Sequence, residues 1–324
     1  MAERTLGLLL RSVALAAVAS ALISVSAQRP DEREIVFDSN LDVNAKEIWV
    51  IRADGSGLWR LTHSPTGTSN QDPRWSPDGR HIAFASDRYA PSQERRRREI
   101  YVMSRDGSDV QRLTFLLRDC WSPEWSPDGR RIAFVSDEVA APPAGETRKI
   151  IYVMDANGSN IRRLMTNQTF SSQAELTPAW SPDGTRIAFT GMARDQEDSE
   201  IYILELGTLT LTQLTDNNVY DAHVAWSPDG QYLSFESDRD PRGFYVMRPD
   251  GSQVVRLTKD HPIDHPRMEN AARWSRDGQR LAFNSTRDYD SNDQGNLEIY
   301  VMNRDGSGLR RLTNNSVKDA HPDW

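Results

Sequence analysis

The sequence predicts an all-β protein, a six-bladed β-propeller with four antiparallel strands in each blade. Three observations lead to this fold. A five-residue motif recurs along the chain at intervals typical of propeller blades. Each copy is followed by the same order of short apolar strands and tight turns. The two ends of the chain carry complementary fragments of this unit, which predicts a ring closed by pairing of the N- and C-terminal strands.

The repeated motif is Trp-Ser-Pro-Asp-Gly, and it reads as a strand end followed by a tight turn. Proline presets φ at the second position of a turn, and glycine accepts the left-handed conformation that closes a hairpin. The motif stands at 75–79, 125–129, 180–184 and 226–230, with a Trp-Ser-Arg-Asp-Gly variant at 274–278 and a final Trp324.

Two apolar strands and a short fourth strand follow each motif. The first reads Ile-Ala-Phe, as at 82–84, and the next reads Glu-Ile-Tyr-Val-Met, as at 99–103 and 298–302. The Glu-Ile-Tyr-Val-Met strand is apolar almost without alternation, so we expect both of its faces to be buried. A turn such as Arg-Asp-Gly-Ser at 105–108 leads to a strand that ends in Arg-Leu-Thr, as at 112–114. Together with the strand ending at tryptophan, each unit has four strands.

The first and last units are incomplete in complementary ways. Residues 35–40 and 47–50, with Leu61 and Thr62, match the second, third and fourth strands of the unit. Residues 319–324 match its first strand. Pairing the two ends completes a sixth blade and removes the sheet edges that an open array would expose. Prolines before the motif tryptophans (Pro73, Pro123, Pro178 and Pro322) place these strands at the inner edge of each blade.

The N-terminus differs in character from the repeats. Arg4 precedes an apolar run from Leu6 to Val25, and small residues follow at 25–27. This pattern is typical of a secretory signal peptide, and an uncleaved membrane anchor is the alternative. We therefore expect a signal peptide at 1–27, a linker at 28–33 and the propeller at 34–324. We expect cleavage after Ala27, no stable membrane insertion afterwards, and a periplasmic or secreted protein.

Composition narrows the classes of partner. Of 324 residues, 47 are acidic and 39 are basic, a formal net charge of −8, which argues against a nucleic-acid partner. A single cysteine, Cys120, excludes an internal disulfide, so the core alone must stabilise the fold. We interpret Cys120 as a small buried apolar residue and expect the protein to be a monomer.

The Trp-Ser-Pro-Asp-Gly, Ile-Ala-Phe, Ile-Tyr-Val-Met and Arg-Leu-Thr signatures together resemble the WD40-like repeats of the TolB propeller family. The resemblance covers residues 34–324. It implies a periplasmic propeller that acts as a protein-docking surface in the Tol–Pal envelope system. Proteins of that family carry an α/β domain before the propeller, and here the signal peptide alone precedes the first repeat. Similar propellers cap prolyl-oligopeptidase-type peptidases, but the chain has no room for their hydrolase domain and no Gly-x-Ser-x-Gly motif.

The long connections of a four-strand meander lie at one end of the ring, and they are the usual carriers of function. Near this loop-rich face, polar residues recur at two repeat positions. Five residues before tryptophan stand Asn70, Cys120, Glu175, Asp221, Glu269 and Asp319. Three residues before it stand Asp72, Ser122, Thr177, His223, Ala271 and His321. We expect the first set to gather near the channel mouth.

These polar residues allow two interpretations. They could cap loop amides and pair with arginines of adjacent blades, or they could bind a ligand. The candidate binding residues at the mouth are Asp72, Glu175, Asp221, His223, Glu269, Asp319 and His321. No cofactor is predicted, although His223 and His321 with nearby carboxylates are chemically able to hold a divalent metal.

Two further segments carry weaker signals. Arginines at 95–98 could meet an anionic polymer or lipid headgroup, or they could form a solvated loop. Residues 288–293 space oxygen atoms like the start of a calcium loop but lack its glycine and glutamate.

The sequence therefore favours an exported, non-catalytic binding module whose partner is a protein or an extracellular polymer. The alternative is a metal-assisted lyase or hydrolase that acts on a polymer at the channel mouth.

Overall fold

The computed structural model describes residues 34–41, 45–65, 67–89, 97–139, 147–164, 170, 176–193, 197–258, 272–286 and 296–324. The predicted signal peptide and linker, Glu175, Glu269 and the segment at 288–293 lie outside these residues. Within the described part of the chain, no helix has the length and apolar character needed to cross a membrane.

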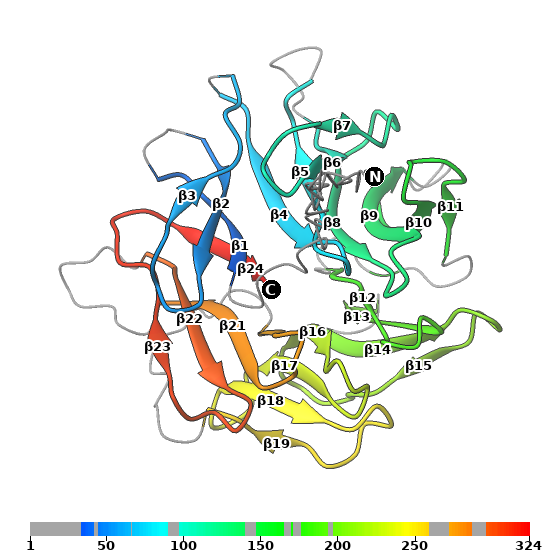
Figure 1. Ribbon diagram of the computed structural model, residues 1–324. Coiled ribbons are helices and arrows are strands. Elements are labelled where there is room, and N and C mark those ends of the chain that lie inside the picture. The colour runs from blue at the N-terminus through cyan, green and yellow to red at the C-terminus, as the bar shows by residue number, and fades with distance from the viewer. Residues whose placement is uncertain are drawn as a thin grey trace, which may run out of the picture.

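Six four-stranded antiparallel sheets stand around a central axis, as the sequence predicts (Figure 1). Blade one combines β24 (Asp319–Asp323), β1 (Glu34–Ser39), β2 (Glu47–Arg52) and β3 (Trp59–Arg60). Blade two contains β4 (Asn70–Trp75), β5 (His81–Ser86), β6 (Glu99–Ser104) and β7 (Gln111–Arg112). Blade three contains β8 (Cys120–Trp125), β9 (Arg131–Val139), β10 (Thr147–Asp155) and β11 (Arg162–Arg163).

The remaining three blades keep the same strand order. Blade four contains β12 (Ala179–Trp180), β13 (Arg186–Gly191), β14 (Glu200–Glu205) and β15 (Leu211–Gln213). Blade five contains β16 (Asp221–Trp226), β17 (Leu233–Ser237), β18 (Gly243–Met247) and β19 (Val255–Arg256). Blade six contains β20 (Arg273–Trp274), β21 (Arg280–Ser285), β22 (Glu298–Asn303) and β23 (Arg310–Arg311).

The predicted closure of the ring is confirmed. β24 pairs antiparallel with β1, so that Asp319 lies opposite Ser39 and Asp323 lies opposite Val36. The Trp324 indole packs with Ile35 and Phe37 in the core between blades one and six. Its Nε1 donates to the Arg273 carbonyl of blade six at 3.0 Å. The last strand of the chain therefore completes the first blade.

The recurring serine and aspartate stabilise the turn that joins the first two strands. In blade two, Ser76 Oγ donates to Asp78 Oδ1 at 2.6 Å, and the Arg80 amide donates to the same oxygen at 3.1 Å. Gly79 has a φ of 62°, in the left-handed region that glycine accepts without strain. The same serine–aspartate contact recurs after the four other motif tryptophans, at Ser126, Ser181, Ser227 and Ser275.

Apolar side chains fill the spaces between neighbouring blades. The phenylalanine of each Ile-Ala-Phe strand is at most 1% exposed, and the motif tryptophans of blades two to five are also buried. Each core cluster combines residues of adjacent blades, such as Ile82 and Phe84 of blade two with Val36 and Ile48 of blade one. The blades are therefore held together by side chains from both faces of the middle strands, as their continuous apolar sequences predict.

Candidate functional site

A bulge interrupts the inner strand at the repeat position three residues before tryptophan. In β4, β8 and β16 the register shifts there, and at the same position φ is positive for Asp72 (54°), Ser122 (47°), His223 (55°) and His321 (55°). A bulge leaves its extra residue outside the strand ladder and re-aims its side chain. These four side chains consequently line the mouth of the central channel on the loop-rich face.

The backbone amide at each bulge donates to a side chain of the preceding blade. The Asp72 amide donates to Asp38 Oδ2 at 3.1 Å, and the Ser122 amide donates to Asp72 Oδ2 at 3.1 Å. The His223 amide donates to Thr190 Oγ1 at 2.8 Å. The bulges therefore leave their buried amides satisfied and connect neighbouring blades.

A cavity of about 320 Å³ lies at the channel mouth. The five described residues three positions before tryptophan all line it, and we call them the mouth ring: Asp72, Ser122, Thr177, His223 and His321. Other lining groups are Gln71, Arg74, Arg98, Asp119, Trp121, Asp137, Lys149, Leu176, Arg273 and Pro322. The lining of the cavity therefore carries charges of both signs and the aromatic surface of Trp121.

His321 bridges blades one and two. Its Nδ1 lies 2.5 Å from Asp38 Oδ2, and its Nε2 lies 3.3 Å from Asp72 Oδ1. Lys46 Nζ lies 2.8 Å from the other oxygen of Asp38. Burial opposes ionisation of Asp38, but Lys46 and His321 outweigh it and hold the pKa of Asp38 well below its usual range. The two ring nitrogens of His321 thus face carboxylates of two neighbouring blades.

His223 occupies the same repeat position in blade five but has different partners. Its Nδ1 lies 3.3 Å from Glu236 Oε2, and Arg242 Nη2 lies 3.2 Å from the other oxygen of Glu236. The side chain is 6% exposed. His223 therefore contributes one ring edge to the cavity and is fixed from behind by a buried carboxylate.

Trp121 provides the aromatic surface of the mouth cavity. Two cations flank its ring, with the Arg98 guanidinium carbon 5.4 Å and Lys149 Nζ 5.6 Å from the ring centroid. Arg98 also pairs with Asp119, which accepts from Arg98 Nε at 3.0 Å and Nη2 at 2.5 Å. Burial, followed by the charge of Asp119, raises the pKa of the neighbouring Asp137. The wall built from blades two and three is therefore more strongly charged than the rest of the lining.

A layer of three charged side chains forms the floor of the mouth cavity. Glu124 Oε2 lies 3.2 Å from Arg74 Nε and 3.2 Å from Arg273 Nη1, so it links blades two, three and six across the channel. Both arginine side chains are 9% exposed. Below the layer, a second cavity of about 390 Å³ opens toward the Ser-Pro-Asp-Gly turns and is lined by their prolines and tryptophans.

The four described residues five positions before tryptophan do not gather at the mouth, and for these four that expectation is wrong. Asn70, Cys120, Asp221 and Asp319 are at most 1% exposed, and none of them lines the mouth cavity. Asp221 accepts from Ser237 Oγ and Arg239 Nη2 within blade five. These side chains support the blades beneath the mouth ring.

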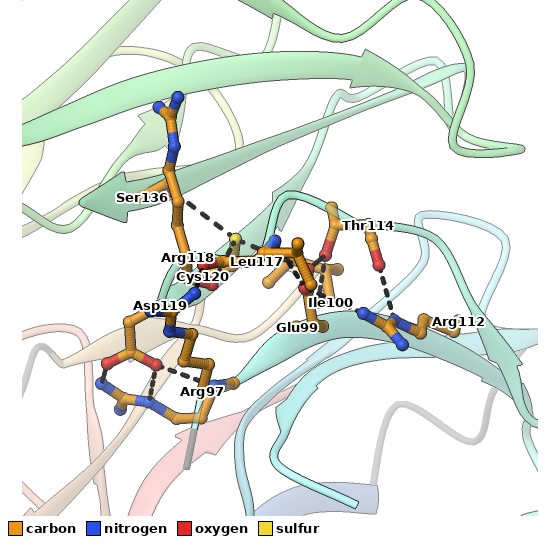
Figure 2. Close-up of polar contacts among 11 residues, drawn as sticks. Arg97, Glu99, Ile100, Arg112, Thr114, Leu117, Arg118, Asp119, Cys120 and Ser136 are labelled. Carbon is orange, nitrogen blue, oxygen red and sulfur yellow. Dashed lines mark hydrogen bonds and ion pairs between the residues drawn. The ribbon is translucent and has the colours of Figure 1, made fainter. Parts of the chain in front are cut away.

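Figure 2 shows this inner network in blades two and three, where Cys120 replaces the usual polar residue. Thr114 donates from its hydroxyl to Glu99 Oε2, and Arg112 Nη2 lies 2.9 Å from Glu99 Oε1. The Cys120 thiol lies 3.5 Å from Ser136 Oγ, and burial raises the pKa of Cys120 to about 12. Cys120 is accordingly a buried thiol, as the sequence interpretation holds.

Asp319 makes folding sensitive to pH, because it is buried and, among the described residues, no arginine takes the place that Arg239 has beside Asp221. Burial raises the pKa of Asp319 to about 6, and the charge of Glu298 adds to the shift. The folded state therefore favours the protonated form. This stabilisation is complete below the ordinary pKa near 3.8 and is lost as pH rises through 6.

We expect Asp319→Asn to raise the free energy of unfolding by about 3 kcal/mol at pH 7.5, because the pKa of Asp319 rises from 3.8 to about 6 and one pKa unit corresponds to about 1.4 kcal/mol. Blade two already has Asn70 at this position, where its amide donates to Glu47 Oε2 at 2.7 Å. Thermal unfolding of parent and variant at pH 7.5 and pH 5 measures the effect. The gain should shrink at pH 5, and a variant less stable than the parent at both values would contradict the assignment.

A possible metal-ligand group among the described residues consists of Asp38, Asp72 and His321, whose ligand atoms lie within 4.8 Å of one another. The group includes one of the two candidate metal ligands, His321, but not His223. Lys46 already neutralises one oxygen of Asp38, and each ring nitrogen of His321 already faces a carboxylate. The contacts are those of a polar cluster that joins blades one and two.

Sequence reasoning missed the residues directly after the Ile-Ala-Phe phenylalanines. This position holds Asp38 in blade one, Thr190 in blade four and Glu236 in blade five, and all three contact the mouth ring. In blade six, Asn284 Oδ1 accepts from the His321 amide at 3.3 Å. The recurrence of polar residues at the end of an otherwise apolar strand is the signal that could have identified them.

Comparison with known proteins confirms the predicted resemblance. A family model described as the TolB beta propeller domain matches residues 10–141 and 169–266. The crystal structure of TolB from Acinetobacter baumannii superposes with a TM-score of 0.70 at 19% identity, covering 90% of this chain and 66% of that one. This likeness supports the fold.

Curated relatives are similar to part of the chain. An uncharacterized peptidase, YuxL of Bacillus subtilis, is 28% identical over 218 residues, which are 64% of this chain and 28% of that protein. A TolB homologue of Chlorobaculum tepidum is 35% identical over 115 residues, which are 34% of this chain and 24% of that protein. The matches thus span about a quarter of the length of these relatives.

Proposed function

The chain belongs to the TolB β-propeller family, and from this premise we propose that it is an exported, non-catalytic binding module. Its ligand is a segment of a protein partner that enters the mouth cavity from the loop-rich face. Relatedness to TolB supports a place in the cell envelope, periplasmic or secreted. The single observation that carries the proposal is a concave mouth, closed below by the Arg74–Glu124–Arg273 layer and provided with an aromatic surface and charges of both signs.

The lining favours recognition of a polypeptide. Trp121 offers a flat apolar surface between two cations, and large aromatic side chains and arginine dominate the energetics of protein interfaces. Asp72, Asp119 and Asp137 offer acceptors for backbone amides or basic side chains. A polypeptide supplies apolar groups, donors and charges within a few residues of one another, whereas a uniformly charged polymer would match one sign of the lining alone.

The contacts of His321 support a binding role over catalysis. A general base must have a ring nitrogen within reach of the reacting proton. Both nitrogens of His321 face carboxylates within its own ion cluster. Its contribution at the mouth is therefore to hold blades one and two in register.

Alanine substitution of the aromatic surface tests this proposal. We expect Trp121→Ala to weaken capture of the partner from envelope extracts of the native host at least tenfold, since interface tryptophans are frequent hot spots. Lys149→Ala should weaken it less. The matched control is Trp59→Ala, which removes another half-buried tryptophan from the outer strand β3.

Thermal melting of each variant separates loss of binding from loss of folding. A selective loss of capture in Trp121→Ala, at a melting temperature close to that of Trp59→Ala, supports the mouth as the binding site. Equal capture by the parent, Trp121→Ala and Trp59→Ala would reject it.

A further inference from the structure

Exposed apolar side chains lie on the connection between blades two and three and on the β5–β6 connection of blade two. Phe115 is 68% exposed, Leu117 is 62% exposed and Tyr89 of the β5–β6 connection is 69% exposed. Side chains with this exposure stand clear of the surface and do not line a groove. We call these three residues the apolar tip.

Tyr89 and Phe115 are linked through Tyr101 and Arg112. Tyr89 stacks on Tyr101 with a centroid distance of 6.4 Å, and Tyr101 lies opposite Arg112 in the β6–β7 pair. The Arg112 guanidinium carbon lies 4.5 Å from the Phe115 ring centroid. Two of the three exposed side chains, Tyr89 and Phe115, thus lie on either side of the buried Tyr101 and of Arg112.

The backbone holds Leu117 outward at a conformational cost. Leu117 has a φ of 53°, a region that residues other than glycine rarely adopt. Its amide donates to Glu99 Oε1 at 3.3 Å, and its carbonyl accepts from Arg97 Nη1. Leu116 between the two exposed residues turns inward and packs against the core with Cys120. The loop thus partly buries Leu116 and presents its two neighbours to solvent.

The same connection is polar in the other blades that the structure describes. Leu116 and Cys120 occupy two matching positions on the connection to blade three. At these positions blade five has Asn217, which donates to Asp221 at 2.8 Å, and blade one has Asn315, which donates to Asp319 at 2.7 Å. Leu116 and Cys120 replace both members of this polar pair, and replacing both partners of a buried hydrogen bond by apolar groups can leave stability nearly unchanged. This replacement does not explain why Phe115 and Leu117 are apolar, because both side chains are exposed and the fold of this blade does not require them.

Two arginines beside the apolar tip, Arg97 and Arg118, have no carboxylate partner among the described residues, whereas Arg112 pairs with Glu99. Arg97 contacts the Leu117 carbonyl, and Arg118 Nη1 lies 3.4 Å from Tyr152 Oη. Among the described residues, neither guanidinium forms an ion pair with a carboxylate, although the whole chain has a net charge of −8. Arginines without a carboxylate partner, next to exposed aromatic and aliphatic side chains, suit a partner whose surface is anionic and whose interior is apolar.

We propose that the apolar tip and its arginines form a membrane-contact site that binds an anionic lipid surface. Phe115, Leu117 and Tyr89 would enter the boundary between headgroups and acyl chains, while Arg97 and Arg118 contact lipid phosphates. A convex tip suits a bilayer, which yields around inserted side chains, whereas a protein partner would need a preformed apolar pocket. The site is separate from the mouth cavity and does not depend on the function proposed for it.

Vesicle sedimentation with the full chain tests this proposal. The probes are vesicles of phosphatidylglycerol and phosphatidylethanolamine, compared with vesicles of phosphatidylcholine alone. We expect sedimentation with the anionic vesicles that weakens at high salt, because screening reduces contacts with phosphates. The double variant Phe115→Ser, Leu117→Ser should bind at least fivefold less, and Arg118→Gln should lose part of the preference for anionic lipid.

The matched control is the double variant Leu209→Ser, Val254→Ser, which removes two exposed apolar side chains. Both lie in tight turns, β14–β15 and β18–β19, on the turn-bearing face of the ring, opposite the loop-rich face. Its binding should equal that of the parent. All substituted side chains are exposed or partly exposed, so the melting temperatures should agree and folding should not confuse the result. No sedimentation of the parent, equal binding to both lipid compositions, or equal losses in the two double variants would overturn the proposal.

Discussion

Deleting residues 319–324 is expected to lower the melting temperature by more than 10 °C or to abolish cooperative folding. The deletion removes β24, the inner strand of blade one, and exposes an edge of β1. It also removes Trp324, which is 7% exposed and packs with Ile35 and Phe37. Loss of a buried tryptophan alone costs about 3–5 kcal/mol, a large part of a typical stability of about 5–15 kcal/mol.

The conservative variant Trp324→Phe is the control, since it keeps the strand and most of the apolar contact. It loses the hydrogen bond from the indole to the Arg273 carbonyl and should melt only a few degrees below the parent. Thermal unfolding followed by circular dichroism measures both. If the deletion melts within two or three degrees of the parent, ring closure does not stabilise the fold as described.

The second large effect is expected from Glu124→Gln. Glu124 is the carboxylate between Arg74 and Arg273, and without it two nearly buried guanidinium groups face each other across the channel. Removing one partner of a buried ion cluster costs about 3–5 kcal/mol, because the remaining charges stay desolvated and unpaired. For a chain of this size each kcal/mol corresponds to a fall of about 2 °C.

Glu138→Gln provides a matched control within the next strand. Glu138 pairs with Arg163 at 3.1 Å, but both side chains are about 30% exposed (28% and 32%). A pair with this exposure contributes about 0–1 kcal/mol, so the control should melt close to the parent. Equal melting temperatures of the two variants would mean that water solvates the Arg74–Glu124–Arg273 layer and that this layer does not stabilise the ring.

The fold could be predicted from the sequence because the local and long-range signals agree. The Ser-Pro-Asp-Gly turns, the apolar middle strands and the complementary ends each specify the same blade, and the structure confirms them. Side-chain contacts that lie within one repeat, such as Ser76 with Asp78, can be read directly from spacing.

The site was harder to predict because strand bulges change which residues face the channel. In a regular strand, residues five and three positions before tryptophan share a face. The bulge between Gln71 and Arg74 breaks this alternation, so Asp72 reaches the mouth while Asn70 stays inside the blade. Contacts between blades, such as His321 with Asp38, join residues 283 positions apart and leave no signal in local spacing. Glu175 and Glu269 lie outside the described residues, and their part in the mouth stays a prediction.

The central claim is that a partner binds in the mouth cavity, and site-specific photocrosslinking tests it most directly. A photoreactive phenylalanine analogue at Gln71, which lines the mouth cavity, should yield a crosslinked adduct in native cells. The same analogue at Pro182, which lines the cavity on the turn-bearing face, should yield none. An adduct at Pro182 without one at Gln71 would contradict the account and place the partner on the opposite face of the propeller.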